Sequence, residues 1–356
     1  MYLEINEDFR DALRDLIAGR ELSIEATRRA VELIVEGAVP ESLVAAFLTA
    51  LRIRGETIDE LTGAALAVRA AATPFFADDD RTTIRPGLLD TCGTGGDGAK
   101  TVNISTATAI VAAAAGAKVA KHGNRSASGN SGSAEVLEKL NVAIDIPAES
   151  AALSLDLLGI TFLFAVKYHP ALRRVAPMRK QLPFRTIFNL VGPLCNPASP
   201  SYQLIGVPNE SHLDIIAGAV ARLGTVDRAA IVWGTDGVDE VSLAAPTRVR
   251  RIENGTIRSE TWTPDDFGLE RVDAHDLVVA DPAASARMIY AILAGESIAA
   301  RRVVLANCAA ALVVAGEASS FRDGVSRAEE AIDSGAAKRL LERWSLLTRS
   351  APPPLA

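Results

Sequence analysis

The chain has 356 residues, of which 49% are apolar and 23% charged, so it has material for a sizeable core and about two domains. Its net charge of −7 argues against a nucleic-acid-binding protein, which needs a basic face. Any anionic ligand must therefore be attracted by local positive features. The three cysteines, Cys92, Cys195 and Cys308, are widely spaced, fit no metal site and favour a reducing, cytoplasmic environment.

The N-terminal 72 residues are predicted to form helices only. Phe9, Leu13 and Leu16 recur at helical spacing, and Gly37 and Gly55 divide the segment into short helices. The acidic N-terminus has no signal-peptide pattern. The longest run of small apolar residues, 107–117, is too short to span a bilayer. We expect a small helical domain at 1–72 and no membrane segment.

After Pro74 the pattern changes to short apolar strands that alternate with helices. Strands are expected near 88–90, 117–120, 161–165, 203–207 and 229–233, and helices near 134–140, 210–222, 282–295 and 325–347. Such alternation predicts a larger α/β domain with a central mixed or parallel sheet flanked by helices.

One stretch, 168–192, interrupts this alternation, because it looks helical again and contains Pro177 and Pro183. We interpret it as a return of the chain to the helical domain. The predicted organisation is therefore a helical domain of 1–72 joined by 168–192, an α/β domain of 73–167 and 193–349, and a tail of 350–356.

A glycine-rich loop, Cys92–Gly98, lies between a predicted strand and a helix that begins near Ser105. Glycines let backbone N–H groups approach a ligand, and a helix start adds partial positive charge. The spacing fits neither a P-loop nor a dinucleotide-binding loop. An anion site is favoured over a plain tight turn. Asn103, Ser105 and Thr106 at the helix start are either capping residues or contacts to phosphate or metal.

A second loop, Lys121–Ser126 continuing to Ser131–Ser133, carries two cations, small hydroxyl side chains and glycines before another helix. Taken alone, this loop could be either a phosphate-binding loop or a solvent-exposed basic loop. Two such loops after successive strands, however, bring two helix N-termini to one sheet edge, which is where open α/β sheets bind ligands. The pair predicts a two-sided phosphate cradle.

Asp239 and Glu240 follow a predicted strand and a glycine turn. Adjacent acids on a loop are usually just solvated. Beside a diphosphate they would repel it unless a hard cation lies between, and Mg²⁺ binds through one or two carboxylates plus phosphate oxygens. Arg179 continues an apolar helical stripe, so it needs an anionic partner, either an intrachain carboxylate or a carboxylate-bearing substrate.

Seven motifs in order make the chain resemble the anthranilate phosphoribosyltransferase family over nearly its whole length. They are Gly93-Thr94-Gly95-Gly96-Asp97, Asn103-Ile104-Ser105-Thr106, Lys121-His122-Gly123-Asn124-Arg125, His169-Pro170-Ala171, Arg185-Thr186-Ile187-Phe188-Asn189, Gly192-Pro193-Leu194 and Asp239-Glu240-Val241. The sequence departs from the family pattern at Leu182-Pro183-Phe184, Asn130, Trp233 and 166–168, which bears on the geometry of the acceptor path.

The resemblance implies a substrate cleft at the hinge of the two domains and a homodimer joined through the helical domains. It implies transfer of the phosphoribosyl group from 5-phosphoribosyl 1-diphosphate to the amine of anthranilate, with release of diphosphate, in tryptophan biosynthesis. It also implies a cytoplasmic enzyme that uses Mg²⁺, two ions per subunit, and binds neither nucleic acid nor membrane.

The resemblance also assigns residues to each ligand. The phosphoribosyl diphosphate would be bound by Gly93, Thr94, Gly95, Gly96, Asp97, Thr101, Asn103, Ser105, Thr106, Lys121, Ser131, Gly132 and Ser133. Anthranilate would be bound by Gly93, His122, Asn124, His169, Arg179, Gly192 and Pro193, and magnesium by Ser105, Asp239 and Glu240. His122 is the candidate for orienting the amine or accepting its proton, and the sequence leaves both roles open.

Two alternatives are weighed against this hypothesis. A nucleoside phosphorylase of the same fold shares a Lys-His-Gly loop, but Asp239-Glu240 and the 169–179 segment suit a metal-bound diphosphate and an aromatic carboxylate better. A non-catalytic relative that binds nucleic acid should have a basic groove and no metal-binding acids.

Overall fold

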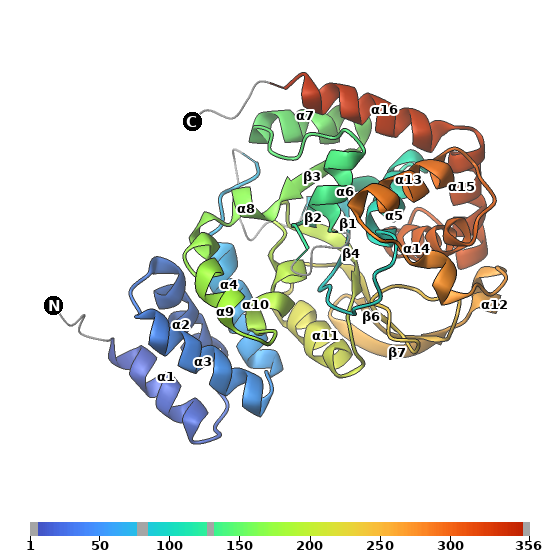
Figure 1. The fold of residues 1–356 in the computed structure, drawn as a ribbon. Helices are drawn as coiled ribbons and strands as arrows, with labels where there is room; N and C mark the ends of the chain where they lie inside the picture. The colour runs from blue at the N-terminus through green and yellow to red at the C-terminus, as the bar shows by residue number, and fades with distance from the viewer. Residues whose placement is uncertain (1–5, 77–84, 127–131, 352–356) are drawn as a thin grey trace.

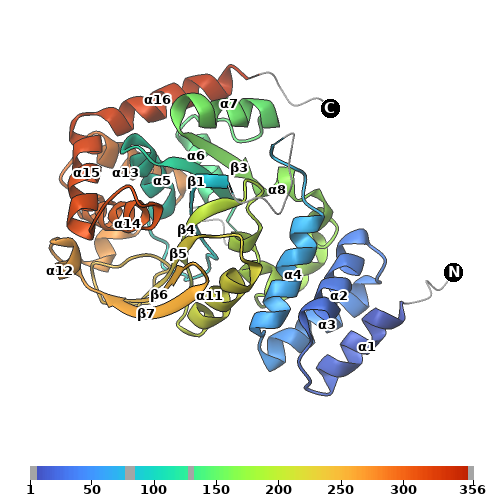
Figure 2. The same ribbon diagram turned by 180° about the vertical axis from the view of Figure 1, so that it is seen from behind.

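The computed structural model describes residues 6–76, 85–126 and 132–351. Figures 1 and 2 show a helical part beside a larger part in which helices flank a twisted sheet. The predicted site residue Ser131 lies outside the described residues. None of the described helices is both long and apolar enough to cross a bilayer.

The helical part begins with four helices, α1 (Glu7–Ile17), α2 (Ile24–Glu36), α3 (Glu41–Arg54) and α4 (Ile58–Ala70). Local sequence signals set their ends. Ser23 caps α2, which ends at Gly37 in the left-handed conformation, and Thr57 with Glu60 forms a capping box on α4.

The segment that follows β3 packs against these helices. It consists of α8 (Ala165–Tyr168), η1 (Pro170–Arg173), α9 (Ala176–Gln181), α10 (Ile187–Leu190) and η2 (Gly192–Cys195). Val175 and Met178 belong to the same apolar cluster as the cores of α2, α3 and α4. The helical character expected of this segment takes the form of short helices and turns, because prolines lie in the first turn of η1 and of α9 and the chain extends after Gln181.

The sheet has seven strands in the order β3-β2-β1-β4-β5-β6-β7. They are β1 (Arg85–Gly93), β2 (Lys118–Gly123), β3 (Ile160–Phe164), β4 (Pro200–Gly206), β5 (Arg228–Gly234), β6 (Thr247–Glu253) and β7 (Thr256–Trp262). Strands β1 to β5 pair in parallel, and β6 and β7 add an antiparallel edge, so the predicted mixed sheet is confirmed.

Helices cover both faces of this sheet. One face packs on α5 (Ile104–Ala114) and α14 (Ala299–Ala315), which α15 (Phe321–Asp333) covers from outside. The other face packs on α11 (Ser211–Leu223), which also contacts α4. The remaining helices are α6 (Ser133–Lys139), α7 (Ala148–Leu158), α12 (Pro264–Phe267), η3 (Ala274–Leu277), α13 (Pro282–Leu293) and α16 (Ala336–Arg349). The helix predicted over 325–347 is two helices, since Gly335 takes a φ of 73° between α15 and α16.

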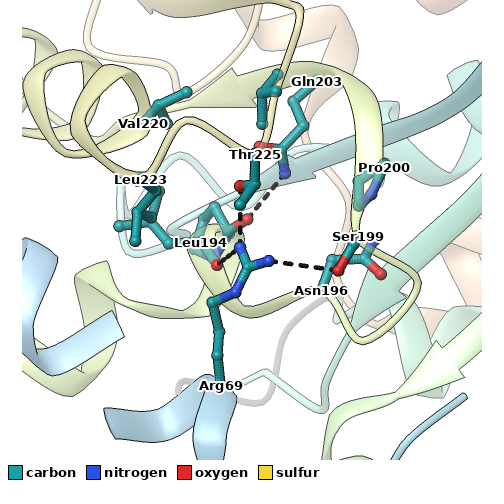
Figure 3. Close-up of a pocket in the computed structure, with 11 residues that line it drawn as sticks. Arg69, Leu194, Asn196, Ser199, Pro200, Gln203, Val220, Leu223 and Thr225 are labelled. Carbon is teal, nitrogen blue, oxygen red and sulfur yellow. Dashed lines mark hydrogen bonds between the residues drawn. The ribbon is translucent and has the colours of Figure 1, made fainter. Parts of the chain in front are cut away.

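Arg69 near the end of α4 ties the helical part to the α/β part. In Figure 3 its guanidinium reaches the carbonyl of Leu194 (3.3 Å) and the hydroxyls of Thr225 (3.0 Å) and Ser199 (3.3 Å). These partners belong to η2 and to the loops before β4 and β5. The small pocket around them is therefore filled by an interdomain contact.

The topology places a crevice at the centre of the sheet. From β1 the chain proceeds to β2 and β3 on one side, whereas β4 and β5 lie on the other. The loops after β1 and β4 therefore leave the carboxyl edge in opposite directions, which is where open α/β sheets bind ligands.

Candidate active site

The first glycine loop leaves β1 at this crevice. The Thr94 N–H donates to the Gly206 carbonyl (3.0 Å), and the Gly95 N–H donates to Oδ2 of Asp239 (3.1 Å). A Cβ on Gly93 would lie 2.8 Å from Asp239 Oδ2, and one on Gly206 would lie 1.6 Å from the Asp239 carbonyl oxygen. Glycine at both strand ends thus lets the acidic loop approach the first glycine loop closely.

The start of α5 lies beside this loop. Asn103 caps the helix, because its side-chain oxygen accepts from the Thr106 N–H (2.9 Å) and from the Ser105 hydroxyl (3.2 Å). Thr101 forms an isolated antiparallel bridge with Val278. The capping interpretation of Asn103 is therefore confirmed, while the Ser105 hydroxyl faces Lys121.

Lys121 lies on β2, between the edge strand β3 and β1, and is buried. Its ammonium donates to the Thr91 carbonyl and to the Ser105 hydroxyl, the latter at 3.1 Å. Burial lowers the pKa of Lys121, and the charge of Asp90 opposes that shift. The Lys121 Nζ is thus held by two hydrogen bonds at the base of the crevice.

The second glycine loop adjoins the start of α6. The Ser133 hydroxyl donates to the Asn124 carbonyl (3.3 Å), and a Cβ on Gly123 would lie 2.3 Å from that hydroxyl oxygen. Gly132 precedes Ser133 as the N-cap of α6. Arg125 instead pairs with Glu138 (2.6 Å) on the surface, so the solvated interpretation fits this one residue.

Asp239 and Glu240 are half-buried, and the surrounding protein atoms raise their proton affinity. Burial, followed by repulsion from Asp97, raises the pKa of Asp239 to about 7. Burial and the charge of Asp239 raise the pKa of Glu240 well above its usual value, against the attraction of Lys121. Neither carboxylate has a salt bridge to a described residue. Such carboxylates fit a hard cation.

The acids do not form a complete metal cage. Within 6–76, 85–126 and 132–351, no three histidine, cysteine, aspartate or glutamate side chains are grouped to hold a metal ion. This donor set suits Mg²⁺, which dehydrates reluctantly and is usually held by one or two carboxylates together with substrate phosphates.

Two histidines face each other on the other side of the crevice. The rings of His122 and His169 meet edge to face with centroids 5.1 Å apart, and His122 Nδ1 lies 3.3 Å from the Gly192 carbonyl. Burial lowers the pKa of His122 to about 3 and that of His169 to about 4. Both rings are therefore neutral. Pro193, next to Gly192, accepts from the Gln203 side chain (2.9 Å).

Arg179 on α9 is half-buried, with its guanidinium carbon 5.3 Å from the centre of the Phe188 ring. Its Nε has no hydrogen-bond partner, and it forms no salt bridge within the described part of the chain. Burial, then repulsion from Arg185, lowers the pKa of Arg179. The intrachain salt bridge that the sequence left open is not seen.

Two residues that the sequence did not assign also shape the site. Buried Asp90 accepts from the His122 N–H (3.2 Å) and from the Asn196 amide (2.8 Å), and so orients β2 and η2. Arg185 donates to the Thr94 carbonyl (2.6 Å), and a Cβ on Gly96 would lie 1.2 Å from its Nη1. Arg185 belongs to the Arg185-Thr186-Ile187-Phe188-Asn189 motif, but only the fold shows that it contacts the first glycine loop.

Family models match both parts of the chain. Residues 10–72 match the helical bundle domain of the glycosyl transferase family, and residues 85–338 match its α/β domain. An anthranilate phosphoribosyltransferase of Rubrobacter xylanophilus is 44% identical over 341 residues, covering 96% of this chain and 97% of that protein. Anthranilate phosphoribosyltransferase 2 of Streptomyces coelicolor is 46% identical over 327 residues, covering 92% and 95%.

The chain belongs to the anthranilate phosphoribosyltransferase family. Solved structures of the family agree in fold. The Thermus thermophilus enzyme matches with a TM-score of 0.87 at 38% identity, over 96% of this chain and 100% of that one. The Saccharomyces cerevisiae enzyme in complex with PRPP and Mg matches with a TM-score of 0.85 at 26% identity, over 98% and 100%. The yeast enzyme with 4-fluoroanthranilate gives 0.84 at 26%, over 96% and 98%.

Proposed function

We propose that the chain transfers the phosphoribosyl group of 5-phosphoribosyl 1-diphosphate to the amine of anthranilate and releases diphosphate, in the crevice at the carboxyl edge of the sheet. This is the reaction of the family to which the chain belongs. The observation that carries the proposal is the meeting of a glycine-loop cradle with two carboxylates that have no salt bridge to a described residue, at the carboxyl edge of the sheet.

The cradle residues bind the phosphoribosyl diphosphate in this proposal. Loop N–H groups, the positive end of α5 and the buried ammonium of Lys121 give fixed positive charge where the leaving group gains negative charge. The full set is Gly93, Thr94, Gly95, Gly96, Asp97, Thr101, Asn103, Ser105, Thr106, Lys121, Ser131, Gly132 and Ser133.

Ser105, Asp239 and Glu240 hold magnesium in this proposal, with two ions per subunit. The yeast relative, with PRPP and Mg bound, supports the use of this metal. When bound, magnesium supplies Lewis-acid charge that stabilises the departing diphosphate. The raised pKa values of Asp239 and Glu240 are the expected state of carboxylates gathered for a cation.

Arg179 holds the anthranilate carboxylate in this proposal, since its guanidinium is half-buried without an anionic partner. His122, Asn124, His169, Gly192, Pro193 and Gly93 line the rest of the acceptor site. The amine is a neutral nucleophile, so holding it in line is the main requirement. With a pKa of about 3, His122 is a poor proton acceptor, and we assign it the orienting role.

The direct test follows anthranilate fluorescence in the presence of 5-phosphoribosyl 1-diphosphate, with a nucleoside plus inorganic phosphate as the second substrate pair. We expect loss of anthranilate with the first pair and no cleavage of the nucleoside. Nucleoside cleavage without anthranilate consumption would establish the phosphorylase alternative. A gel shift with single-stranded DNA at low salt should show no complex.

The proposal extends to a homodimer joined through the helical parts, in the cytoplasm. Ile17 on α1 and Ile53 on α3 support it, because these apolar side chains are 73% and 81% exposed. The free, buried cysteines fit a reducing compartment. Light scattering after gel filtration tests the dimer. A dimer that survives when Ile53 is replaced by Glu would place the interface elsewhere.

A further inference from the structure

A second cavity lies behind the first glycine loop, between the helical and α/β parts. Its volume is about 100 Å³, and its lining comes from α3, the loop before α10 and the start of α11. The lining residues are Arg52, Glu56, Gly96, Arg185, Thr186, Leu190, Pro208, Asn209 and His212. It meets the diphosphate cradle at Gly96, against which the Arg185 guanidinium rests.

Two side-chain nitrogens in the lining of this cavity have no hydrogen-bond partner among the described residues. Arg185 Nε and His212 Nδ1 are buried without a hydrogen-bond partner, and Arg52 has no salt bridge within the described residues. The cavity also includes the N-terminal end of the 13-residue helix α11, where the His212 N–H donates to the Asn209 carbonyl (3.2 Å). A helix N-terminus adds further partial positive charge.

Among the residues that line the cavity, two arginines, Arg52 and Arg185, face one carboxylate, that of Glu56. Asp97 and Asp239 of the adjoining cradle also attract Arg185. Burial lowers the pKa of His212, and the charges of Arg185 and Arg52 lower it further. Burial raises the pKa of Glu56, and Arg52 opposes that shift. A small anion that replaced water here would gain attraction from both guanidinium groups.

We propose that this cavity is an anion subsite that receives the diphosphate product as it leaves the cradle, with Arg52 and Arg185 as its cationic walls. The proposal rests on the phosphoribosyl-transfer function above. Arg185 touches both compartments, so one guanidinium serves the loop that grips the diphosphate and the cavity behind it. A cavity of about 100 Å³ has room for several water molecules or a small oxyanion, so it can receive one phosphate end of the diphosphate while the other end remains at the Gly96 loop.

Two substitutions that change the charge of the cavity in opposite directions test the subsite. Arg52→Gln removes a cation from the cavity, and Glu56→Gln removes the one carboxylate among the described lining residues. Arg343→Gln on α16 is the matched control, since it removes the same charge from an exposed position on another helix. Calorimetric titration with sodium diphosphate, with magnesium and without anthranilate, measures binding directly. Product inhibition by diphosphate is measured in parallel.

We expect Arg52→Gln to weaken diphosphate binding about tenfold, as the loss of one charge-assisted contact does. We expect Glu56→Gln to tighten it and Arg343→Gln to leave it unchanged. The KM for 5-phosphoribosyl 1-diphosphate should change much less than the diphosphate constants. Orthophosphate should bind at the same cavity, more weakly and without competing with anthranilate.

Three results would overturn the subsite. One is unchanged diphosphate binding in both Arg52→Gln and Glu56→Gln. Another is a parallel rise of the KM for 5-phosphoribosyl 1-diphosphate, which would place Arg52 in the cradle itself. The third is competition between orthophosphate and anthranilate, which would make the cavity part of the acceptor site. Failure of the proposed function is distinct, since it would appear as absence of anthranilate consumption by the unaltered chain.

Discussion

Arg179 shows how one side chain distinguishes the two substrates. Replacing it by alanine should remove a charge-assisted contact worth roughly 1.5–3 kcal/mol. We expect a raised KM for anthranilate and little change in the KM for 5-phosphoribosyl 1-diphosphate, measured by steady-state fluorescence kinetics. Lys180→Ala, one position along the same helix and exposed, is the control and should leave both constants unchanged. A larger effect on the phosphoribosyl substrate would refute the assignment.

The buried histidines make a prediction about acid stability. A histidine whose pKa falls from 6.5 to about 4 on folding binds its proton more readily in the unfolded chain. Stability contributed by neutral His169 is therefore present above pH 6.5 and is lost as pH falls from 6.5 towards 4. Raised carboxylate pKa values act in the opposite direction, so a variant must be compared with the unaltered chain.

We expect His169→Asn to lose less stability than the unaltered chain on acidification, by roughly 2 kcal/mol between pH 7.5 and pH 5. Urea unfolding at the two pH values measures this difference. Equal losses in the two proteins would mean that His169 is not held neutral. Mutating His275, which is exposed on η3, is the control and should not reduce the loss.

At the residue scale, the sequence identified side chains proposed to contact a substrate or metal. It did not identify side chains that position other parts of the site through hydrogen bonds. Arg179 and Asp239 stood out because charge occurred at apolar or phosphate-adjacent positions. Asp90 and Arg185 gave no comparable signal, since their importance comes from contacts with residues far along the chain, such as Asn196 and Thr94.

The first glycine loop is an element whose conformation can be tested with a matched pair. Gly96 and Gly98 both have positive φ, 84° and 75°, so a side chain strains both. A Cβ on Gly96 would also collide with Arg185, whereas one on Gly98 would meet nothing within 4 Å. We expect Gly96→Ala to raise the KM for 5-phosphoribosyl 1-diphosphate more than Gly98→Ala, because in addition to a strain of about 1–2 kcal/mol it displaces the Arg185 guanidinium from the Thr94 carbonyl. Equal effects would show that the Arg185 contact is unimportant.

The sequence predicted the five parallel strands, but it did not predict the two antiparallel strands at the edge of the sheet, β6 and β7. Buried strands such as β3 and β5 read as continuous apolar runs bounded by glycine. Strands β6 and β7 are rich in charged and polar residues on their exposed positions, so no apolar run marked them. Asn254 and Gly255 between them, with φ of 47° and 75°, form the tight turn that was the available signal.

The contact of Arg69 with the hinge belongs to the scale of the whole molecule. Hydrogen bonds from its guanidinium link α4 to Leu194, Ser199 and Thr225. Arg69→Leu should lower the free energy of unfolding by about 1–3 kcal/mol, because buried acceptors lose their partner. Urea unfolding measures this, with Arg287→Leu on the exposed face of α13 as control. An unchanged midpoint would mean that Arg69 does not hold the two parts together.

The two-part architecture followed from the sequence because its hydrophobic period changes after residue 72. The crevice required the strand order, since only the placement of β1 between β2 and β4 brings Gly93, Lys121 and Asp239 to one edge. Residues 168–192 pack against α2, α3 and α4 through apolar contacts between residues far apart in the sequence. The hydrophobic periodicity indicates which residues are apolar and inward-facing, but it does not indicate which residues they contact.

The central claim is that Asp239 and Glu240 make the glycine cradle a metal-diphosphate site. The measurement is anthranilate consumption with 5-phosphoribosyl 1-diphosphate across a magnesium titration, for the unaltered chain and for Asp239→Asn combined with Glu240→Gln. We expect magnesium-dependent turnover in the unaltered chain and its loss in the double variant, with folding checked by circular dichroism. Full turnover in a folded double variant, at the same magnesium concentrations, would contradict the account.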